Sequence, residues 1–130
     1  KVDTLTGVTT AGSISVTGEG NSTTTNLQQG LAKAWVRYDG SGVMSITDSA
    51  GLSSLSDDGT GLATLTVTNA MSNANYAVSG VCQFQNNTGQ TLCEGPSDAT
   101  TTAYEFRTKT TNNTLYDSDQ VSSLIHGDLA

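Results

Sequence analysis

Two short runs of β-forming residues, separated by a segment of aspartate, glycine and serine, limit the folds open to this chain. The runs are residues 32–38 and 43–47, and residues 39–42 (Asp-Gly-Ser-Gly) lie between them. Aspartate and glycine tolerate the positive φ angles of tight turns, so the pattern predicts a β-hairpin. The simplest register sets Tyr38 opposite Val43.

This register places apolar side chains on both faces of the hairpin, because side chains alternate across a strand. One face has Ala34, Val36, Tyr38 and Val43, and the other has Lys33, Trp35, Arg37, Met44 and Ile46. A single free sheet would be apolar on one face only. We therefore expect the first face in the core and the second, with the only tryptophan, against another sheet or another subunit, and we assign it to a subunit interface. The alternative is that Trp35 is a core residue and its two basic neighbours extend past it to water.

The rest of the chain favours an all-β fold. Its 130 residues are rich in threonine, serine and glycine, and 35% are hydrophobic. Residues 62–68 alternate, with Ala63, Leu65 and Val67 on one face and threonines on the other. About eight such short strands are typical of a sandwich or a barrel, and we predict an antiparallel β-sandwich. Because a modest core often gains stability from self-association, we expect this domain to associate with copies of itself. We expect residues 1–26 to be a connecting segment with short strands and residues 27–130 to be the sandwich domain.

Local patterns predict further details. Residues 26–29 suit one helical turn capped by asparagine, and residues 48–51 suit a loop. Gly80, inside a strand over residues 76–84, indicates a bulge or a close neighbour. Cys82 and Cys93 flank a predicted hairpin turn at residues 86–89. They would form a disulfide in an oxidising compartment and remain buried thiols in a reducing one.

The charge excludes some classes of partner. The formal net charge is −7, and such a surface repels the phosphates of nucleic acids. The chain also lacks a run of 18 apolar residues, so we predict no insertion into a membrane. Because it begins with Lys1, we expect it to be a piece of a longer protein.

The sequence offers little for catalysis or metal binding. His126 is the only histidine, and no nucleophile elbow or zinc motif is present. We predict a protein that is not an enzyme, with no catalytic residues, no cofactor and no metal site. The paired acids at residues 57–58 and at residues 117 and 119 offer oxygen ligands suited to calcium. Short acids also favour turns for their backbone hydrogen bonds alone, and we prefer that interpretation.

A ligand-binding loop is the most credible activity. Residues 112–120 combine amides and carboxylates, which bind hydroxyl groups, with an aromatic ring that can stack on a sugar. The candidate receptor-binding residues are Asn112, Asn113, Tyr116, Asp117 and Asp119. The alternative is that a polar loop is asparagine-rich only because it is soluble.

Three segments together resemble a domain found in structural proteins of tailed phages, especially marine and cyanobacterial ones. They are residues 30–36 (Gly-Leu-Ala-Lys-Ala-Trp-Val), residues 58–61 (Asp-Gly-Thr-Gly), and residues 70–78 with Ala-Met and Ala-Asn-Tyr-Ala-Val. The resemblance runs from about Leu27 to the end, and residues 30–36 are its most specific part. The chain departs from the pattern at residues 37–38 and 122–123, which leaves the packing of a trimer open.

In that family, such domains look like the C-terminal tips of trimeric tail fibres. The resemblance therefore implies a homotrimer in the virion, in contact with other virion proteins and working outside the cell. It implies attachment to a cell-surface glycan or protein of the host, and it offers no catalytic residues. The alternative is a purely structural virion module, such as a capsid decoration or a baseplate–fibre joint, with no receptor site.

Overall fold

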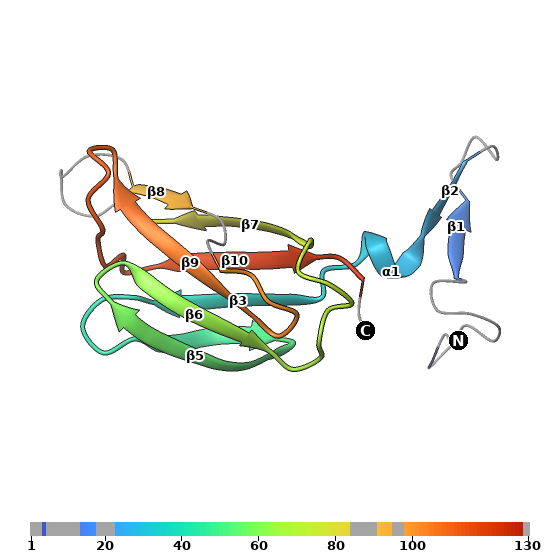
Figure 1. The fold of residues 1–130 in the computed structure, drawn as a ribbon, viewed down its shortest axis with the longest axis horizontal. Coiled ribbons are helices and arrows are strands. Elements are labelled where there is room, and N and C mark those ends of the chain that lie inside the picture. The colour runs from blue at the N-terminus through green and yellow to red at the C-terminus, as the bar shows by residue number, and fades with distance from the viewer. Residues whose placement is uncertain (1–3, 5–13, 18–22, 84–90, 95–97, 129–130) are drawn as a thin grey trace.

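The fold is all-β with antiparallel sheets, as predicted (Figure 1). The computed structural model describes residues 4, 14–17, 23–83, 91–94 and 98–128. Two four-stranded sheets form the sandwich, which matches the expected eight strands. The first sheet has the order β4-β3-β10-β7, with β3 at Ala34–Asp39, β4 at Ser45–Ala50, β7 at Ala77–Cys82 and β10 at Val121–His126. The second sheet has the order β5-β6-β9-β8, with β5 at Leu52–Gly59, β6 at Leu62–Val67, β8 at Thr91–Glu94 and β9 at Ala103–Thr110.

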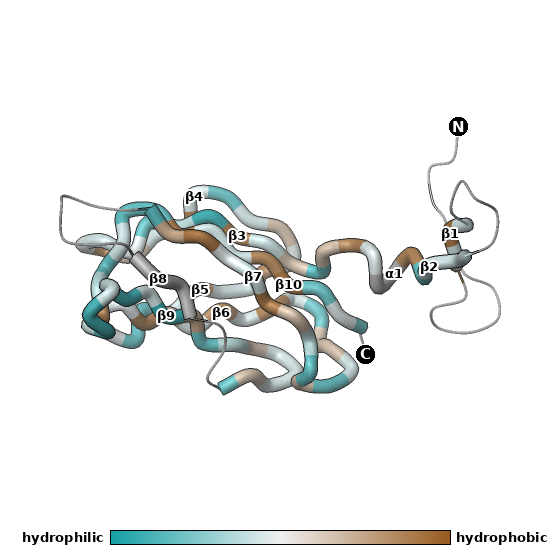
Figure 2. The backbone as a smooth tube through the Cα atoms, turned by 90° about the horizontal axis from the view of Figure 1, so that it is seen from above, coloured by the Kyte–Doolittle hydropathy of each residue, from teal (hydrophilic) through white to brown (hydrophobic). Residues whose placement is uncertain are grey.

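A small antiparallel ribbon precedes the sandwich. It consists of β1 (Ser15–Thr17) and β2 (Thr24–Asn26), and the single-turn helix α1 (Leu27–Gly30) follows it, close to the predicted turn. Figures 1 and 2 place this ribbon beyond the end of the sandwich where the chain also finishes. The domain boundary between residues 26 and 27 stays a prediction. No helix in the described part of the chain is long and apolar enough to span a membrane.

The core lies between the two sheets and follows the period-two pattern of the sequence. Ala63, Leu65 and Val67 are buried on the inner face of β6, as predicted. Figure 2 shows hydrophobic and hydrophilic residues alternating along the strands. The other buried hydrophobic residues are Ala34, Val36, Tyr38, Met71, Tyr104, Phe106, Val121 and Ile125.

The predicted hairpin exists as β3 and β4, but its register is different. Tyr38 pairs with Ile46, and the ladder shifts at a bulge beside Arg37. The cause is a longer loop, because the Asp39 carboxylate accepts hydrogen bonds from the Ser41 amide and hydroxyl (2.8 and 2.7 Å). These bonds favour a local turn over further pairing.

The shifted register exchanges the roles of two hydrophobic residues in the loop. Val43, predicted on the core face, is 91% exposed. Met44, predicted on the Trp35 face, packs against the core instead.

Two further expectations about connections are wrong. Residues 48–50 belong to β4 rather than to a loop, and the chain turns into β5 at Gly51 alone, which has a φ of 72°. The strand continues because an edge strand facing solvent accommodates Asp48 and Ser49 without burying them. That corner carries the chain from the first sheet to the second.

The predicted hairpin across residues 86–89 does not join β7 to β8 as paired strands; the turn itself lies outside the described residues. β7 pairs with β10 in the first sheet, and β8 pairs with β9 in the second. Each strand completes the edge of a different sheet, so both inner faces remain covered. Cys82 is disulfide-bonded, and the chain's other cysteine, Cys93, lies in β8.

Figure 1 shows three described connections at the end of the sandwich opposite the ribbon. They are the β3–β4 loop (residues 40–44), the β5–β6 turn (residues 60–61) and the β9–β10 loop (residues 111–120). We call this the far end. The predicted receptor-binding loop is therefore one of the elements most distant from the N-terminal ribbon.

Candidate functional site

The outward faces of the two sheets differ in character. The second sheet carries Thr64, Thr66, Glu105, Arg107 and Lys109 outward, and the Arg107 guanidinium forms an ion pair with Glu105 of the same strand. Such a polar face is typical of a sheet that meets solvent. In the first sheet, by contrast, Trp35 is 39% exposed, Ile46 42% and Val81 69%. In β5, β6 and β9, the strands of the second sheet whose side-chain exposure is described, no large hydrophobic residue is among the exposed ones.

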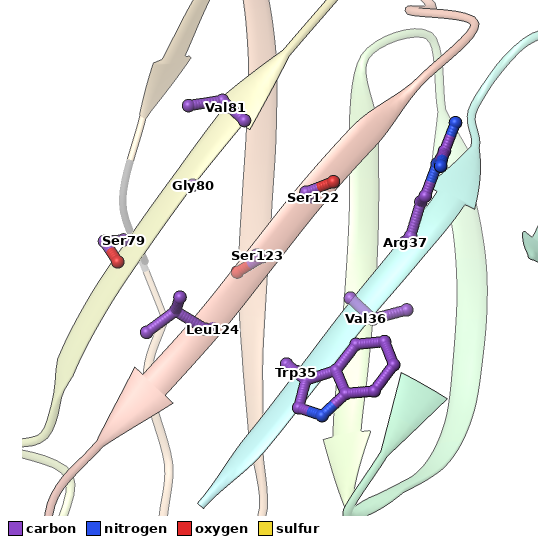
Figure 3. Close-up of a pocket in the computed structure, with 9 residues that line it drawn as sticks. All are labelled: Trp35, Val36, Arg37, Ser79, Gly80, Val81, Ser122, Ser123 and Leu124. Atoms are coloured by element: carbon purple, nitrogen blue, oxygen red, sulfur yellow. The ribbon is translucent and has the colours of Figure 1, made fainter. Parts of the chain in front are cut away.

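A groove of about 510 Å³ crosses β3, β10 and β7 on the outward face of the first sheet (Figure 3). Strand register arranges its side chains in two rows. Trp35, Leu124 and Ser79 form one row, and Arg37, Ser122 and Val81 form the other. We call these six residues the outer groove. The small side chain of Ser122 lies between Arg37 and Val81, so the surface is hollow there.

The floor of the outer groove depends on Gly80, which faces the core. A Cβ at this position would lie 2.5 Å from Phe106 Cζ and 2.7 Å from the Ser122 carbonyl oxygen. The predicted close neighbour is therefore confirmed, and it is the ring of Phe106. Glycine lets β7 lie close over this ring, since any side chain would push the strand outward.

Ser122 and Ser123 are neighbours in β10 but have different environments. Ser122 faces outward in the groove, whereas Ser123 is buried and its Oγ lies 3.1 Å from the Tyr104 hydroxyl. Burial raises the pKa of Tyr104, although the Ser123 bond opposes that rise. Burial, with a smaller contribution from Tyr104, also raises the pKa of Tyr38. Both phenols therefore stay protonated at neutral pH and do not act as bases.

Tyr104→Phe is expected to lower the free energy of unfolding by about 0.5–2 kcal/mol, because it leaves the Ser123 hydroxyl buried without its partner. Urea denaturation of the single variants and of the double variant with Ser123→Ala would measure the effect. The double variant should be less destabilised than the two single variants added together. Strict additivity would show that this hydrogen bond contributes nothing.

The outer groove is connected to the β9–β10 loop by one side-chain contact. Arg37 Nη2 donates a hydrogen bond to Oε1 of Gln120, the last residue of that loop. Across the strands, Arg37 also faces Asp48 on β4 and Ser122 on β10. Its guanidinium thus lies at the edge of the groove that is nearer to the far end.

The β9–β10 loop is held to the rest of the far end by backbone hydrogen bonds. The Tyr116 amide donates to the Thr108 carbonyl oxygen (3.0 Å), and the Gly40 amide donates to the Ser118 carbonyl oxygen (2.9 Å). The buried Ser118 hydroxyl donates to the carbonyl oxygen of Gln83 (2.9 Å). These bonds fix the loop against the β3–β4 loop and against the chain that follows β7.

The five predicted receptor-binding residues lie in this loop but differ in what they do. Asp117 accepts a hydrogen bond from the Gly61 amide (2.6 Å), so one carboxylate oxygen stabilises the β5–β6 turn. Asn113 adopts a φ of 63° and accepts a bond from Lys109 Nζ (3.0 Å), which is turn chemistry. Asn112 is exposed, while Tyr116 and Asp119 are half-buried. Asn112 and Asn113 are thus the two exposed residues of the five, and the Asn113 side chain already binds Lys109.

The five predicted interface residues are divided between two environments. Trp35 and Arg37 are both exposed on the outward face of β3, as the alternation predicted, and Lys33 is half-buried just before that strand. Ile46 is exposed on β4, whereas Met44 packs against the core.

The acidic turns use their oxygens locally. Asp57 accepts a bond from the Gly59 amide (3.0 Å) and Asp58 from the Ser56 hydroxyl (3.0 Å). The Ser41 hydrogen bonds lower the pKa of Asp39. Nowhere in the described ranges do three His, Cys, Asp or Glu side chains come together in a group able to hold a metal ion.

Four groove residues were not predicted as site residues from the sequence: Ser79, Ser122 and the two apolar ones, Val81 and Leu124. Each of the two apolar residues lies among polar or small neighbours on the face opposite the core positions of its strand, such as Val121 and Ile125 in β10. The signal that could have identified Val81 and Leu124 is an apolar residue at a strand position where the alternation would place a polar, solvent-facing one.

Comparison of the chain with models of protein families, with curated proteins and with solved structures finds no match.

Proposed function

We propose that this chain is the tip of a phage tail fibre, assembled as a homotrimer, which attaches the virion to a glycan or protein on the host surface. It works outside the cell as part of the virion and catalyses no reaction. The observation that carries the proposal is the position of the β9–β10 loop at the end of the sandwich opposite the N-terminal ribbon. The resemblance of residues 27–130 to tail-fibre tips supports the same conclusion.

The far end suits recognition because its loops are held in place before a ligand arrives. The Asp117–Gly61 and Ser118–Gly40 bonds connect three loops that are distant in sequence. A preordered surface loses less conformational entropy on binding than a flexible one. Asn112 presents an exposed amide on this surface, and an amide both donates and accepts hydrogen bonds to sugar hydroxyls.

The second candidate function is a purely structural virion module without a receptor site. It is favoured by the internal hydrogen bonds of Asp117 and Asn113, which account for both residues through loop stability alone. In that case the far end would be rigid for assembly with other virion proteins.

Binding of the labelled chain to a glycan array and to bacterial cells would test the first function against the second. We expect Asn112→Ala to weaken binding roughly 3- to 10-fold, the effect of losing one hydrogen bond of about 0.5–1.5 kcal/mol. Asn75→Ala is the matched control, since Asn75 is also exposed but lies in the connection between β6 and β7, at the opposite end of the sandwich. Folded protein that binds neither glycans nor cells would favour the structural module, and equal losses in the two variants would exclude the β9–β10 loop as the contact.

A further inference from the structure

We propose that the outer groove is the surface through which copies of this chain contact one another. The occupant of the groove is a second copy lying beside the first along its long axis. This inference rests on the homotrimer proposed above and assigns the contact surface within it.

Charge is the first argument for a second copy. The chain has 12 acidic and 5 basic residues, so two copies repel each other over most of their surfaces. The six groove residues include no carboxylate, Arg37 is their only charged side chain, and Asp48 of β4, on the same face of the sheet, lies opposite Arg37. An acidic copy therefore meets less repulsion at the groove than at the far end, where Asp117 and Asp119 lie.

The distribution of exposed hydrophobic residues is the second argument. Among the residues whose exposure the structure describes, they are Leu31 after α1, Val16 in β1 and Val43 in a loop, besides Trp35, Ile46 and Val81 on the first sheet. Apart from Val43, they extend from the ribbon to the first sheet. A parallel neighbour, whose ribbon and sheet follow the same order along the long axis, would cover both parts at once.

The size of the sheet face supports this longer contact. Four strands of six residues cover roughly 400 Å² at ordinary strand spacings. One partner of a standard stable interface buries about 800 Å². The sheet face alone is thus about half of what is needed, and Leu31 and Val16 extend it in the direction of the ribbon.

A small polar ligand fits the groove less well. Only Ser79 and Ser122 offer hydroxyl groups, and the Arg37 guanidinium already donates to Gln120. A sugar buried there would leave most of its hydroxyl groups without partners, and each such group has an energetic cost. The apolar side chains of Trp35, Leu124 and Val81 suit a dry contact between protein surfaces.

Sedimentation equilibrium of the full chain, wild type and variants, tests the assignment. We expect Val81→Asp to weaken self-association at least about tenfold, because it places a carboxylate in a dry contact, where removing its hydration is costly. Val43→Asp is the matched control: the same substitution at an even more exposed valine, outside the groove. The fluorescence of Trp35, the only tryptophan, gives a second measurement. Its quenching by acrylamide should fall as wild-type protein is concentrated, and should not fall for Val81→Asp.

The results separate the two proposals. A wild-type chain that stays monomeric at high concentration overturns the homotrimer and this inference together, whereas host binding is measured separately on the far end. An oligomer that persists in Val81→Asp, or that both variants disrupt equally, overturns the groove as the contact and leaves the homotrimer standing. A monomer whose Trp35 is protected from acrylamide by an added glycan would show that the occupant is a sugar, which also overturns this inference.

Discussion

Gly61→Ala is expected to lower the free energy of unfolding by about 2–5 kcal/mol, through backbone strain and steric overlap together. Gly61 has a φ of 68°, which is unfavourable for any residue with a Cβ atom. An added Cβ would lie 2.5 Å from the Thr108 carbonyl oxygen and 2.6 Å from the Tyr116 amide nitrogen. Both are backbone atoms, so relief of the overlap requires movement of β9 or of the β9–β10 loop.

Chemical denaturation of Gly61→Ala and Gly42→Ala would separate the two causes. Gly42 has a similar φ of 60°, but no atom lies within 4 Å of the position of its Cβ. Gly42→Ala should therefore show the strain alone, about 1–2 kcal/mol. If both variants lower the free energy of unfolding by the same amount, the close approach of Gly61 to the β9–β10 loop does not contribute to the loss of stability. If Gly61→Ala also weakens host binding more than Gly42→Ala, the order of that loop matters for recognition.

Cys82→Ala is expected to lower the free energy of unfolding by about 2–4 kcal/mol, because loss of the disulfide raises the conformational entropy of the unfolded chain. Cys82 ends β7, an edge strand of the first sheet, and Cys93 lies in β8, an edge strand of the second.

Thermal unfolding with and without a thiol reductant would measure the contribution of this disulfide. The reductant should lower the Tm of the wild type and leave that of Cys82→Ala unchanged. A wild-type Tm that does not change after full reduction, verified by thiol titration, would show that the bond does not stabilise the sandwich.

Patterns of single strands were predictable from the sequence, and pairings between strands were less so. The alternation in residues 62–68 fixed the buried face of β6, because burial on one side of a strand imposes period two. The β3–β4 register depended instead on Asp39 and its bonds to Ser41, which compete with the ladder. The placement of β7 and β8 in different sheets depended on which longer strands, β10 and β9, were available to pair.

The candidate site shows the same limit. Composition predicted residues 112–119 as a receptor-binding loop, and this loop lies at the far end. Composition could not show that the Asp117 carboxylate accepts a hydrogen bond from Gly61, which is 56 residues away in sequence. The outer groove needed three strands to come together, and only the β3 part, Trp35 and Arg37, was predicted from the hairpin. Val81 and Leu124 joined it through pairing with β10 and β7 that no local pattern specifies.

The lateral borders of the sandwich have a consequence for how larger structures can grow. At one border the chain crosses from β4 in the first sheet to β5 in the second at Gly51. At the other border, Cys82 at the end of β7 forms a disulfide bond. Bulges further interrupt β4 and β5, the two strands that meet at the first border. Amyloid-like fibrils grow when an edge strand of one molecule pairs with an edge strand of the next. This pairing needs edge strands that are long and regular. This architecture therefore resists open-ended polymerisation, and a defined number of copies can associate through their faces or ends without it.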